Sequence, residues 1–368
     1  MATVPMSDTP APGPIDADLH SAVPNAQALF PYLNAYWRET MTETAFKGPP
    51  HNPYPANAPT SARPGSKPES GPPGSDLALM RTQALDPYGT EIGILNCSYG
   101  IESIHNPDGA AALAAAVNDW HRAEWLDREP RLRASILVPS RQPEMAAAEI
   151  ERVAGDSRFV QVYLPVRSEA PYGNRRYHAL FAAAAKHDLT IGLHFGGATG
   201  QAPTSSGWPS YYIEEVAGMA QIFQSQIFSM IAEGLFDRFP TLRVTCIEGG
   251  WTWLPSLMWR VDKEWKGLRR EVPWVRKLPS DYMREHCRFT TLPHDCPDDP
   301  AQTRQVMAQM DAADLLLFAT DYPHWHGDSD GDGDNRTPDI LPVPLTEDER
   351  RKILRDNALA WYPRLGQQ

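Results

Sequence analysis

Residues 315–325 read LLLFATDYPHW, an apolar run that ends at Asp321. An uninterrupted apolar run is typical of a strand that is buried on both faces, as in a parallel sheet. A carboxylate directly after such a strand is either a surface turn residue or a group held at the end of the sheet for chemistry. The strands predicted elsewhere in the chain help to distinguish between these two possibilities.

Seven similar runs precede this one, and segments of helical character separate them. The eight expected strands are 13–19, 91–97, 133–138, 158–164, 189–195, 242–248, 286–291 and 314–320. Apolar residues recur at helical spacing over 108–129, 143–154, 174–187, 211–236 and 299–311. Strands that alternate with helices in this way predict a parallel sheet that is covered on both faces.

Eight strand–helix units in 368 residues fit a (β/α)8 barrel. The predicted fold class is therefore α/β, a TIM barrel, with residues 1–368 forming a single domain. An open, doubly wound sheet is the competing architecture. It is disfavoured because no G-x-G-x-x-G motif follows the first strand.

Residues 49–75 interrupt the alternation, since nine of these 27 residues are proline and no hydrophobic period is present. A segment of this composition predicts an extended loop rather than a helix or strand. The 48 residues before it are too few to form a domain of their own. We therefore expect a Pro-rich loop insertion that wraps the barrel.

The composition limits the possible partners. The formal net charge is −12 and no basic stripe is present, which argues against nucleic acid. No apolar run approaches the roughly 20 residues that a membrane span needs, and the N-terminus MATVPMSDTPAPGP lacks the basic and apolar regions of a secretory signal. We expect a cytoplasmic protein without a membrane partner. Its four cysteines, none in a C-x-x-C pair, are expected to be buried free thiols: Cys97, Cys246, Cys287 and Cys296.

Imidazoles and carboxylates end several of the predicted strands. They are Asp18 and His20 on the first strand, His194 on the fifth, Glu248 on the sixth and Asp321 on the eighth. In a TIM barrel these strand ends meet at the face that carries the active site. Two histidines and two carboxylates can hold one Zn²⁺, Mn²⁺ or Fe²⁺ ion with positions left open. We therefore predict a metal site formed by Asp18, His20, His194 and Asp321.

Residues that follow these strands are candidates for contact with a substrate. His324 lies in the loop just beyond Asp321, and three aromatic residues follow the fifth and sixth strands: Trp208, Tyr211 and Trp251. Aromatic side chains at the mouth suit an apolar or aromatic small molecule. Packing over the top of the barrel is the alternative role for each of them.

A second acidic motif, DSDGDGDNRTPD, occupies residues 328–339 and has the spacing of an EF-hand loop. The usual flanking helices are missing, and Pro338 and Asn335 occupy unusual positions in the loop. A Ca²⁺ site and a solvated acidic loop are both compatible with this sequence.

Four motifs, in order, resemble the aminocarboxymuconate-semialdehyde decarboxylase branch of the amidohydrolase superfamily: DADLH, GLHFGG, CIEGGWTWLPSLMWRVDKEW and FATDYPHW. The closing DNALAWY resembles the last helix of that family. The resemblance implies a (β/α)8 barrel with one divalent metal ion, held by Asp18 and His20, by His194 and by Asp321. It also implies a homo-oligomer, a dimer or larger, for which the helices over 211–236 and 253–270 are candidate contacts.

Two positions depart from the commonest pattern of the family. Many members carry H-x-H on the first strand, whereas this chain has Asp18, a harder ligand that favours Mn²⁺ or Fe²⁺ over Zn²⁺. The decarboxylases of the family usually end the sixth strand with a catalytic histidine, and here that position is Glu248. Glu248 can be an acid or base, a further ligand, or a structural hydrogen-bond acceptor.

These observations leave three hypotheses. The first is a metal-dependent decarboxylase of a small aromatic or unsaturated carboxylic acid, with Glu248 or another acid protonating carbon. The second is a hydrolase of an ester, amide or lactone, in which Asp321 takes a proton from metal-activated water. The third is a binding protein on a degenerate barrel, which the intact ligand set disfavours.

Overall fold

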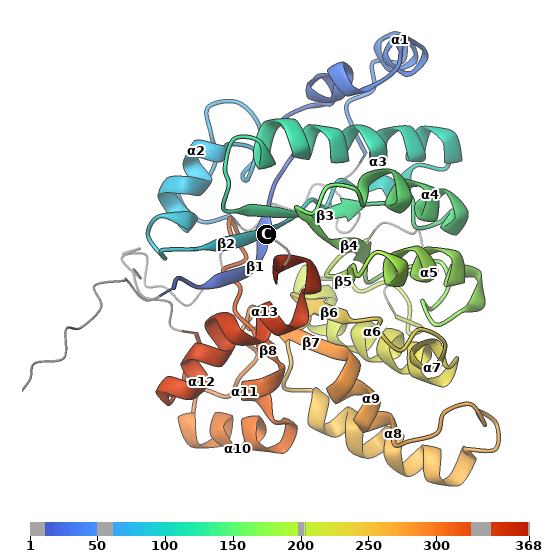
Figure 1. Cartoon of the computed structure of the whole chain (residues 1–368), viewed down its shortest axis with the longest axis vertical. Coiled ribbons are helices and arrows are strands. Elements are labelled where there is room, and N and C mark those ends of the chain that lie inside the picture. Colours follow the sequence, from blue (N-terminus) through green and yellow to red (C-terminus); the bar gives the residue numbers. More distant parts are fainter. Residues whose placement is uncertain (1–11, 50–61, 198–201, 203, 325–339, 367–368) are drawn as a thin grey trace, which may run out of the picture.

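The computed structural model describes residues 12–49, 62–197, 202, 204–324 and 340–366. Eight parallel strands follow one another in chain order within a single sheet (Figure 1). They are β1 (Ile15–His20), β2 (Ile92–Asn96), β3 (Leu132–Leu137), β4 (Phe159–Pro165), β5 (Thr190–His194), β6 (Val244–Ile247), β7 (Cys287–Thr290) and β8 (Leu316–Leu317). Each predicted strand therefore overlaps an observed one.

The sheet closes on itself because residues after β8 hydrogen-bond to β1. The backbone N–H of Ala17 donates to the carbonyl of Phe318 at 2.9 Å, and that of His20 donates to the carbonyl of Tyr322 at 2.7 Å. Leu19 and Tyr322 also form a parallel bridge. The predicted (β/α)8 barrel is confirmed.

Helices cover the outside of the barrel (Figure 1). The α-helices are α1 (Ala35–Glu43), α2 (Leu77–Met80), α3 (Pro107–His121), α4 (Pro143–Val153), α5 (His178–Lys186), α6 (Tyr212–Ala232), α7 (Leu235–Arg238), α8 (Leu254–Leu268), α9 (Pro279–His286), α10 (Pro300–Met310), α11 (Ala312–Leu315), α12 (Glu347–Arg351) and α13 (Asn357–Trp361). Shorter 3-10 and π-helical segments are η1 (Ala26–Tyr32), η2 (Arg81–Leu85), η3 (Ile101–Ser103), η4 (Arg122–Leu126), η5 (Arg175–Tyr177), η6 (Lys352–Asp356) and η7 (Pro363–Gly366).

Two elements differ in extent from the prediction. The helix expected over 211–236 is divided at Gly234, whose φ of 73° is left-handed. The strand expected over 314–320 is reduced to β8, because the N–H of Phe318 donates to Ile353 and the N–H of Thr320 donates to the carboxylate of Asp16. The Asp16 acceptor is a side chain of β1 rather than its backbone, and Ile353 lies outside the sheet.

The C-terminal end of the chain fills one end of the barrel. Trp361 and Tyr362 are buried in a cluster with β-strand side chains that include Ile15, Ile94 and Leu317. The red α13 lies across the strands in Figure 1. The predicted site residues His20 and His194 lie at the opposite end, where β1 and β5 finish.

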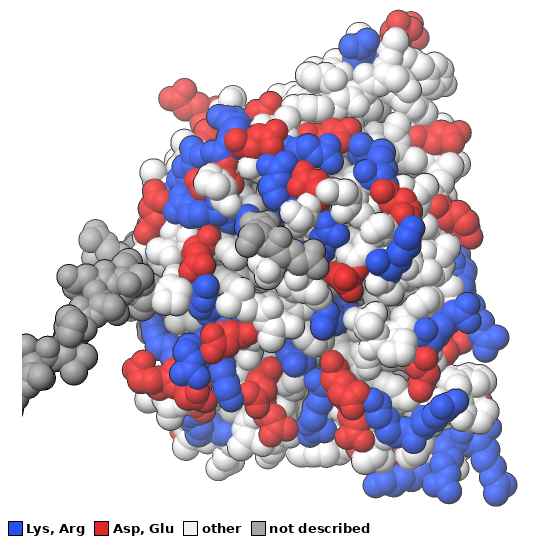
Figure 2. Space-filling model, in the orientation of Figure 1, with Lys and Arg blue, Asp and Glu red and all other residues white. Residues whose placement is uncertain are grey.

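The surface carries charges of both signs. Figure 2 shows acidic and basic side chains interspersed over the face in view, without a continuous stripe of one sign. In the described part of the chain, none of the helices combines the length and apolar character that crossing a bilayer requires. All four cysteines are free; three are buried and Cys296 is half-buried.

Candidate metal centre

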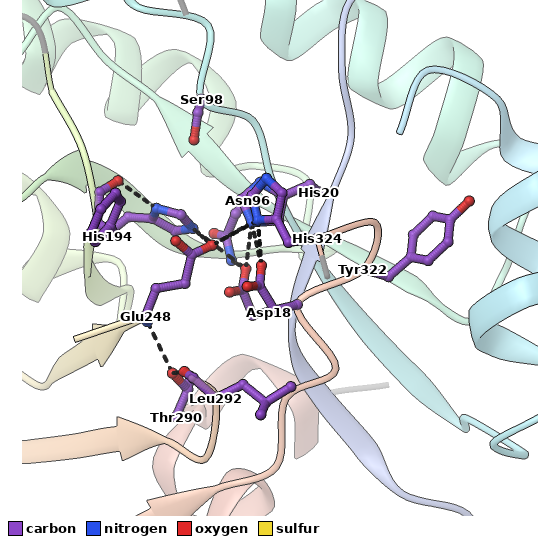
Figure 3. A network of polar contacts seen from close by, with 12 residues as sticks. Asp18, His20, Asn96, Ser98, His194, Glu248, Thr290, Leu292, Tyr322 and His324 are labelled. Atoms are coloured by element: carbon purple, nitrogen blue, oxygen red, sulfur yellow. Dashed lines mark hydrogen bonds and ion pairs between the residues drawn. The ribbon is translucent and has the colours of Figure 1, made fainter. Parts of the chain in front are cut away.

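Four of the predicted site residues converge where β1, β5 and β6 end. One ligand atom from each of Asp18, His20, His194 and Glu248 can be chosen so that all lie within 4.8 Å of one another. Figure 3 shows these side chains pointing toward a common point from different strands. Metal ligands require such convergence, because an ion of about 2.0–2.3 Å bond length contacts all its ligands at once.

Asp321 and His324 join the same cluster from the loop after β8. Asp321 Oδ1 lies 2.9 Å from His20 Nε2 and 2.9 Å from His324 Nδ1. Glu248 Oε1 lies 2.6 Å from His20 Nε2 and 3.5 Å from His324 Nδ1. His20, Glu248, Asp321 and His324 thus form a second group with ligand spacing, which overlaps the first.

Two buried atoms of the cluster have no hydrogen-bond partner among the described residues: Asp18 Oδ2 and His194 Nε2. His194 Nδ1 lies 2.9 Å from the carbonyl oxygen of Phe195, so Nε2 faces the cluster, 3.4 Å from Glu248 Oε1 and 3.5 Å from Asp18 Oδ1. Unpaired buried polar atoms are costly. A divalent ion beside Nε2 would offset this cost, and the Asp18 and Glu248 carboxylates nearby would balance its charge, so the residues present fit a metal site.

The charges of the cluster also suit a cation. Burial and the nearby His324 would lower the pKa of His20, but Asp18, Glu248 and Asp321 raise it to about 10. Burial and Asp321 would raise the pKa of Glu248, but His194 and His20 hold it below its ordinary value. The Glu248 carboxylate therefore stays ionised and helps to retain a proton on the His20 imidazole. A metal ion can take the place of that proton.

The backbone at both catalytic candidates is left-handed. Glu248 has a φ of 58° and Asp321 a φ of 51°, although neither is glycine. The N–H of Glu248 donates to the Thr290 hydroxyl at 3.1 Å, which holds the turn after β6 in place. Strained backbone of this kind is concentrated at functional sites, where it directs a side chain.

Asn96 is a site residue that the sequence did not single out. It ends β2 opposite His20, and its Nδ2 donates to Asp18 Oδ1 at 2.9 Å. The sequence does show a polar residue near the end of a predicted strand, which is the pattern that identified the other site residues. Its contact with Asp18 depends on the β1–β2 register, which only the structure supplies.

The predicted substrate-contact residues lie in different surroundings. His324 is part of the cluster, and its side chain is 26% exposed to solvent. Trp208 and Tyr211 are exposed in the segment before α6, and the Arg167 guanidinium lies 5.7 Å from the Trp208 ring. Trp251 is fully buried. The structure thus brings only His324 of these four to the ligand cluster.

Tyr163 is a further aromatic residue beside the cluster. Its ring centroid lies 5.2 Å from that of His194, and its hydroxyl is 2.8 Å from the Ser98 hydroxyl. Figure 3 shows Ser98 on the side of the cluster opposite Thr290. The candidate Ca²⁺ loop at 328–339 and much of the Pro-rich insertion lie outside the described residues.

Comparisons with known proteins identify the family of this chain. The sequence model of the amidohydrolase family matches residues 15–364. The gamma-resorcylate decarboxylase of Rhizobium sp. (strain MTP-10005) is 26% identical over 298 residues, 77% of this chain and 86% of that protein. The gamma-resorcylate decarboxylase of Rhodococcus jostii (strain RHA1) is 24% identical over 302 residues, 78% and 88% of the two chains.

Solved structures share the fold. The dihydroxybenzoic acid decarboxylase of Polaromonas sp. JS666, with bound manganese and the inhibitor 2-nitroresorcinol, superposes with a TM-score of 0.66 at 20% identity, over 96% of this chain and 97% of that one. A 2,6-dihydroxybenzoate decarboxylase complexed with 2,6-dihydroxybenzoate also gives a TM-score of 0.66, at 21% identity, over 96% and 100%. Since the family match spans nearly all of the described barrel, this chain belongs to the amidohydrolase family.

Proposed function

We propose that this protein is a metal-dependent carboxy-lyase that decarboxylates a small aromatic acid. The observation that carries the proposal is the pair of unsatisfied buried atoms, His194 Nε2 and Asp18 Oδ2, inside a cluster of imidazoles and carboxylates. The activity named for the related decarboxylases supports the reaction class.

Asp18, His20 and His194 would hold the ion, with Asp321 as the fourth predicted ligand. When bound, a divalent ion supplies positive charge that binds the carboxylate and a neighbouring oxygen of the acid and withdraws electrons from its ring. Three carboxylates surround the position, which favours a hard ion such as Mn²⁺ or Fe²⁺ over Zn²⁺. The manganese in the related Polaromonas structure supports this preference.

His324 and Asp321 would hold a proton and transfer it to the substrate. His324 Nδ1 lies 2.9 Å from Asp321 Oδ1, and His324 is more exposed than the other imidazoles of the cluster. A proton held between these atoms is delivered to the ring carbon that bears the carboxylate. The bond from that carbon to the carboxylate then breaks, its electron pair returns to the ring, and carbon dioxide leaves.

Glu248 would assist as an acceptor. Its Oε1 lies within 2.6 Å of His20 Nε2 and 3.5 Å of His324 Nδ1, so it can keep a proton within reach of both rings. This geometry favours the acid–base or ligand role over a purely structural one.

Hydrolysis is the second candidate, and one observation favours it. Asp321 Oδ1 and Glu248 Oε1 face the same volume beside His20, and either carboxylate can accept a proton from a water molecule there. The substrate would then be an ester, amide or lactone.

We also propose a homo-oligomer that works in the cytoplasm. Large apolar side chains are exposed on α6 and α8, among them Ile213 at 75% and Trp259 at 59%. Apolar side chains exposed to this degree are common at subunit contacts. Sedimentation of the purified chain tests this proposal.

The test is a paired assay of the Mn²⁺-loaded protein. Hydroxylated benzoic acids, including 2,6-dihydroxybenzoate, are followed by release of carbon dioxide, and aryl esters and lactones by release of acid. Metal-dependent carbon dioxide release supports the carboxy-lyase. Hydrolysis of esters or lactones without carbon dioxide release replaces it with the second candidate.

A further inference from the structure

A buried line of hydrogen bonds begins at the C-terminal end of the chain, in the filled end of the barrel. The indole Nε1 of Trp361 donates to Thr245 Oγ1 at 3.0 Å. Thr245 Oγ1 lies 3.1 Å from the Tyr362 hydroxyl, which donates to Gln161 Oε1 at 3.0 Å. The side chains of β4 and β6 thus link the C-terminal segment to the barrel interior.

The same line continues to the predicted metal ligand on β1. Gln161 Nε2 donates to Asn96 Oδ1 at 3.1 Å, and Asn96 Nδ2 donates to Asp18 Oδ1 at 2.9 Å. Ser135 also stabilises the orientation of Asn96, because its hydroxyl donates to Asn96 Oδ1 at 2.6 Å. Asp18, Asn96 and Gln161 are all fully buried, so water does not compete for these bonds.

The two ends of the line fix the direction of every bond between them. An indole N–H can only donate, and at the other end the Asn96 amide N–H donates to Asp18 Oδ1. The Tyr362 hydroxyl donates its one hydrogen to Gln161 Oε1. In its contact with Thr245 it must therefore accept, and the Thr245 hydroxyl is the donor. The Gln161 and Asn96 amides then have one favourable orientation each, because a flipped Asn96 would turn its carbonyl oxygen toward Asp18.

Gly192 leaves the room that this arrangement needs. A Cβ at Gly192 would lie 2.5 Å from the Gln161 amide. The Gln161 amide therefore fits in the barrel interior only because residue 192 has no side chain.

We propose that Asn96, held by Gln161 and Tyr362, is a positioning residue for Asp18, and that the C-terminal segment thereby sets the metal affinity of the site. Asn96 donates to Asp18 Oδ1, the oxygen that lies 3.5 Å from His194 Nε2 and 3.7 Å from His20 Nε2, and so holds the carboxylate toward the ligand cluster. This inference rests on the metal site of the proposed function. Outer partners of metal ligands commonly change affinity by about 10- to 100-fold when removed.

The test is calorimetric titration of the metal-free full-length protein with Mn²⁺. Four variants are compared with wild type: Asn96→Ala, Tyr362→Phe, the double variant, and Tyr282→Phe. The last is a matched control, because the Tyr282 hydroxyl donates to Asp237 at 2.7 Å, outside the line. Circular dichroism establishes that each variant is folded.

We expect Asn96→Ala to raise the Kd for Mn²⁺ by about 10- to 100-fold. Tyr362→Phe deletes one oxygen atom and should raise the Kd by about three- to tenfold, the equivalent of one net hydrogen bond. Because Tyr362 acts through Asn96, the double variant should match Asn96→Ala. Tyr282→Phe should bind as wild type does, even if its melting temperature falls by as much as that of Tyr362→Phe.

Wild-type affinity in Tyr362→Phe, or additive losses in the double variant, would overturn the coupling to the C-terminal segment. Wild-type affinity in Asn96→Ala would overturn the positioning role itself. If Asn96→Ala does not fold, Tyr362→Phe decides alone. Absence of Mn²⁺ binding by the wild type would instead reject the metal site, and with it the proposed function.

Discussion

At the residue scale, the two oxygens of Asp18 show how the site is prepared for a cation. Oδ1 accepts a hydrogen bond from Asn96, while Oδ2 has no hydrogen-bond partner among the described residues. The same division occurs at His194, where Nδ1 is bound to the Phe195 carbonyl and Nε2 is left for the cluster. These hydrogen bonds hold both side chains toward the cluster, where His194 Nε2 and the Asp18 carboxylate would be available to an ion.

Asp321 gives the first prediction. Asp321→Asn keeps an oxygen for the ion but removes the carboxylate that shares a proton with His324. We expect kcat for carbon dioxide release to fall by about 10²- to 10⁴-fold, while the metal content stays near that of wild type.

The control for this variant is Asp299→Asn. Asp299 caps α10, and asparagine caps helices equally well, so activity should be unchanged. A wild-type kcat in Asp321→Asn would exclude Asp321 from proton transfer.

The sequence predicted which side chains meet at one end of the barrel, but not the contacts that orient them. Asp18, His20, His194 and Asp321 lie at or just after the ends of predicted strands, and the barrel rule places such residues at one face. Asn96 also ends a strand, yet its partner depends on register, which residue patterns do not specify. The role of His324 depends on a turn at Asp321 that pattern reasoning does not resolve.

At the element scale, the alternation of strands and helices predicted the barrel. The length of the last strand was predicted as 314–320, whereas β8 comprises only Leu316–Leu317. The run LLLF is apolar along its whole length, but the N–H groups of Phe318 and Thr320 donate to the Ile353 carbonyl and the Asp16 carboxylate instead of to the backbone of a strand. A hydrophobic pattern records burial, and buried backbone can have hydrogen-bond partners outside a sheet.

The approach of α6 to the loop before α5 gives the second prediction. A Cβ at Gly173 would lie 2.2 Å from the Ser229 carbonyl oxygen. Gly173→Ala should therefore lower the free energy of unfolding by about 1–3 kcal/mol in urea denaturation. Gly155→Ala is the matched control, because nothing lies within 4 Å of its added Cβ. Equal stability in both variants would show that the two segments separate without cost.

The contact between α3 and the end of β1 gives the third prediction. His121 is fully buried, its Nε2 is 2.7 Å from the Ser21 hydroxyl, and burial lowers its pKa to about 3. The unfolded chain binds a proton at this imidazole below about pH 6.5, whereas the folded protein does not. Stability is therefore lost as the pH falls from about 6.5 toward 3, by up to about 1.4 kcal/mol per unit.

The variant His121→Gln removes this titration. The difference in unfolding free energy between pH 7 and pH 5 should be smaller in the variant than in wild type, by up to about 2 kcal/mol. Urea denaturation at the two pH values measures it. The same pH dependence in both proteins would mean that His121 is protonated when folded.

At the scale of the whole molecule, the proposed metal site would couple metal binding to folding. The proposed ligands come from β1, β5 and the loop after β8, which are adjacent only in the folded barrel. An ion that binds the folded state alone, supplied at about 100 times its Kd, adds about 2.7 kcal/mol to the free energy of unfolding. Thermal unfolding with and without Mn²⁺ measures this as a rise in the melting temperature. An unchanged melting temperature in saturating Mn²⁺ would contradict it.

The metal content of the purified protein tests the central claim most directly. Elemental analysis is made on protein prepared without chelators, beside a His194→Ala variant that folds. We predict about one transition-metal ion per chain in wild type and its loss in the variant. A wild-type chain that holds no ion, even after incubation with Mn²⁺, Fe²⁺ or Zn²⁺, would mean that the cluster of Asp18, His20 and His194 is structural.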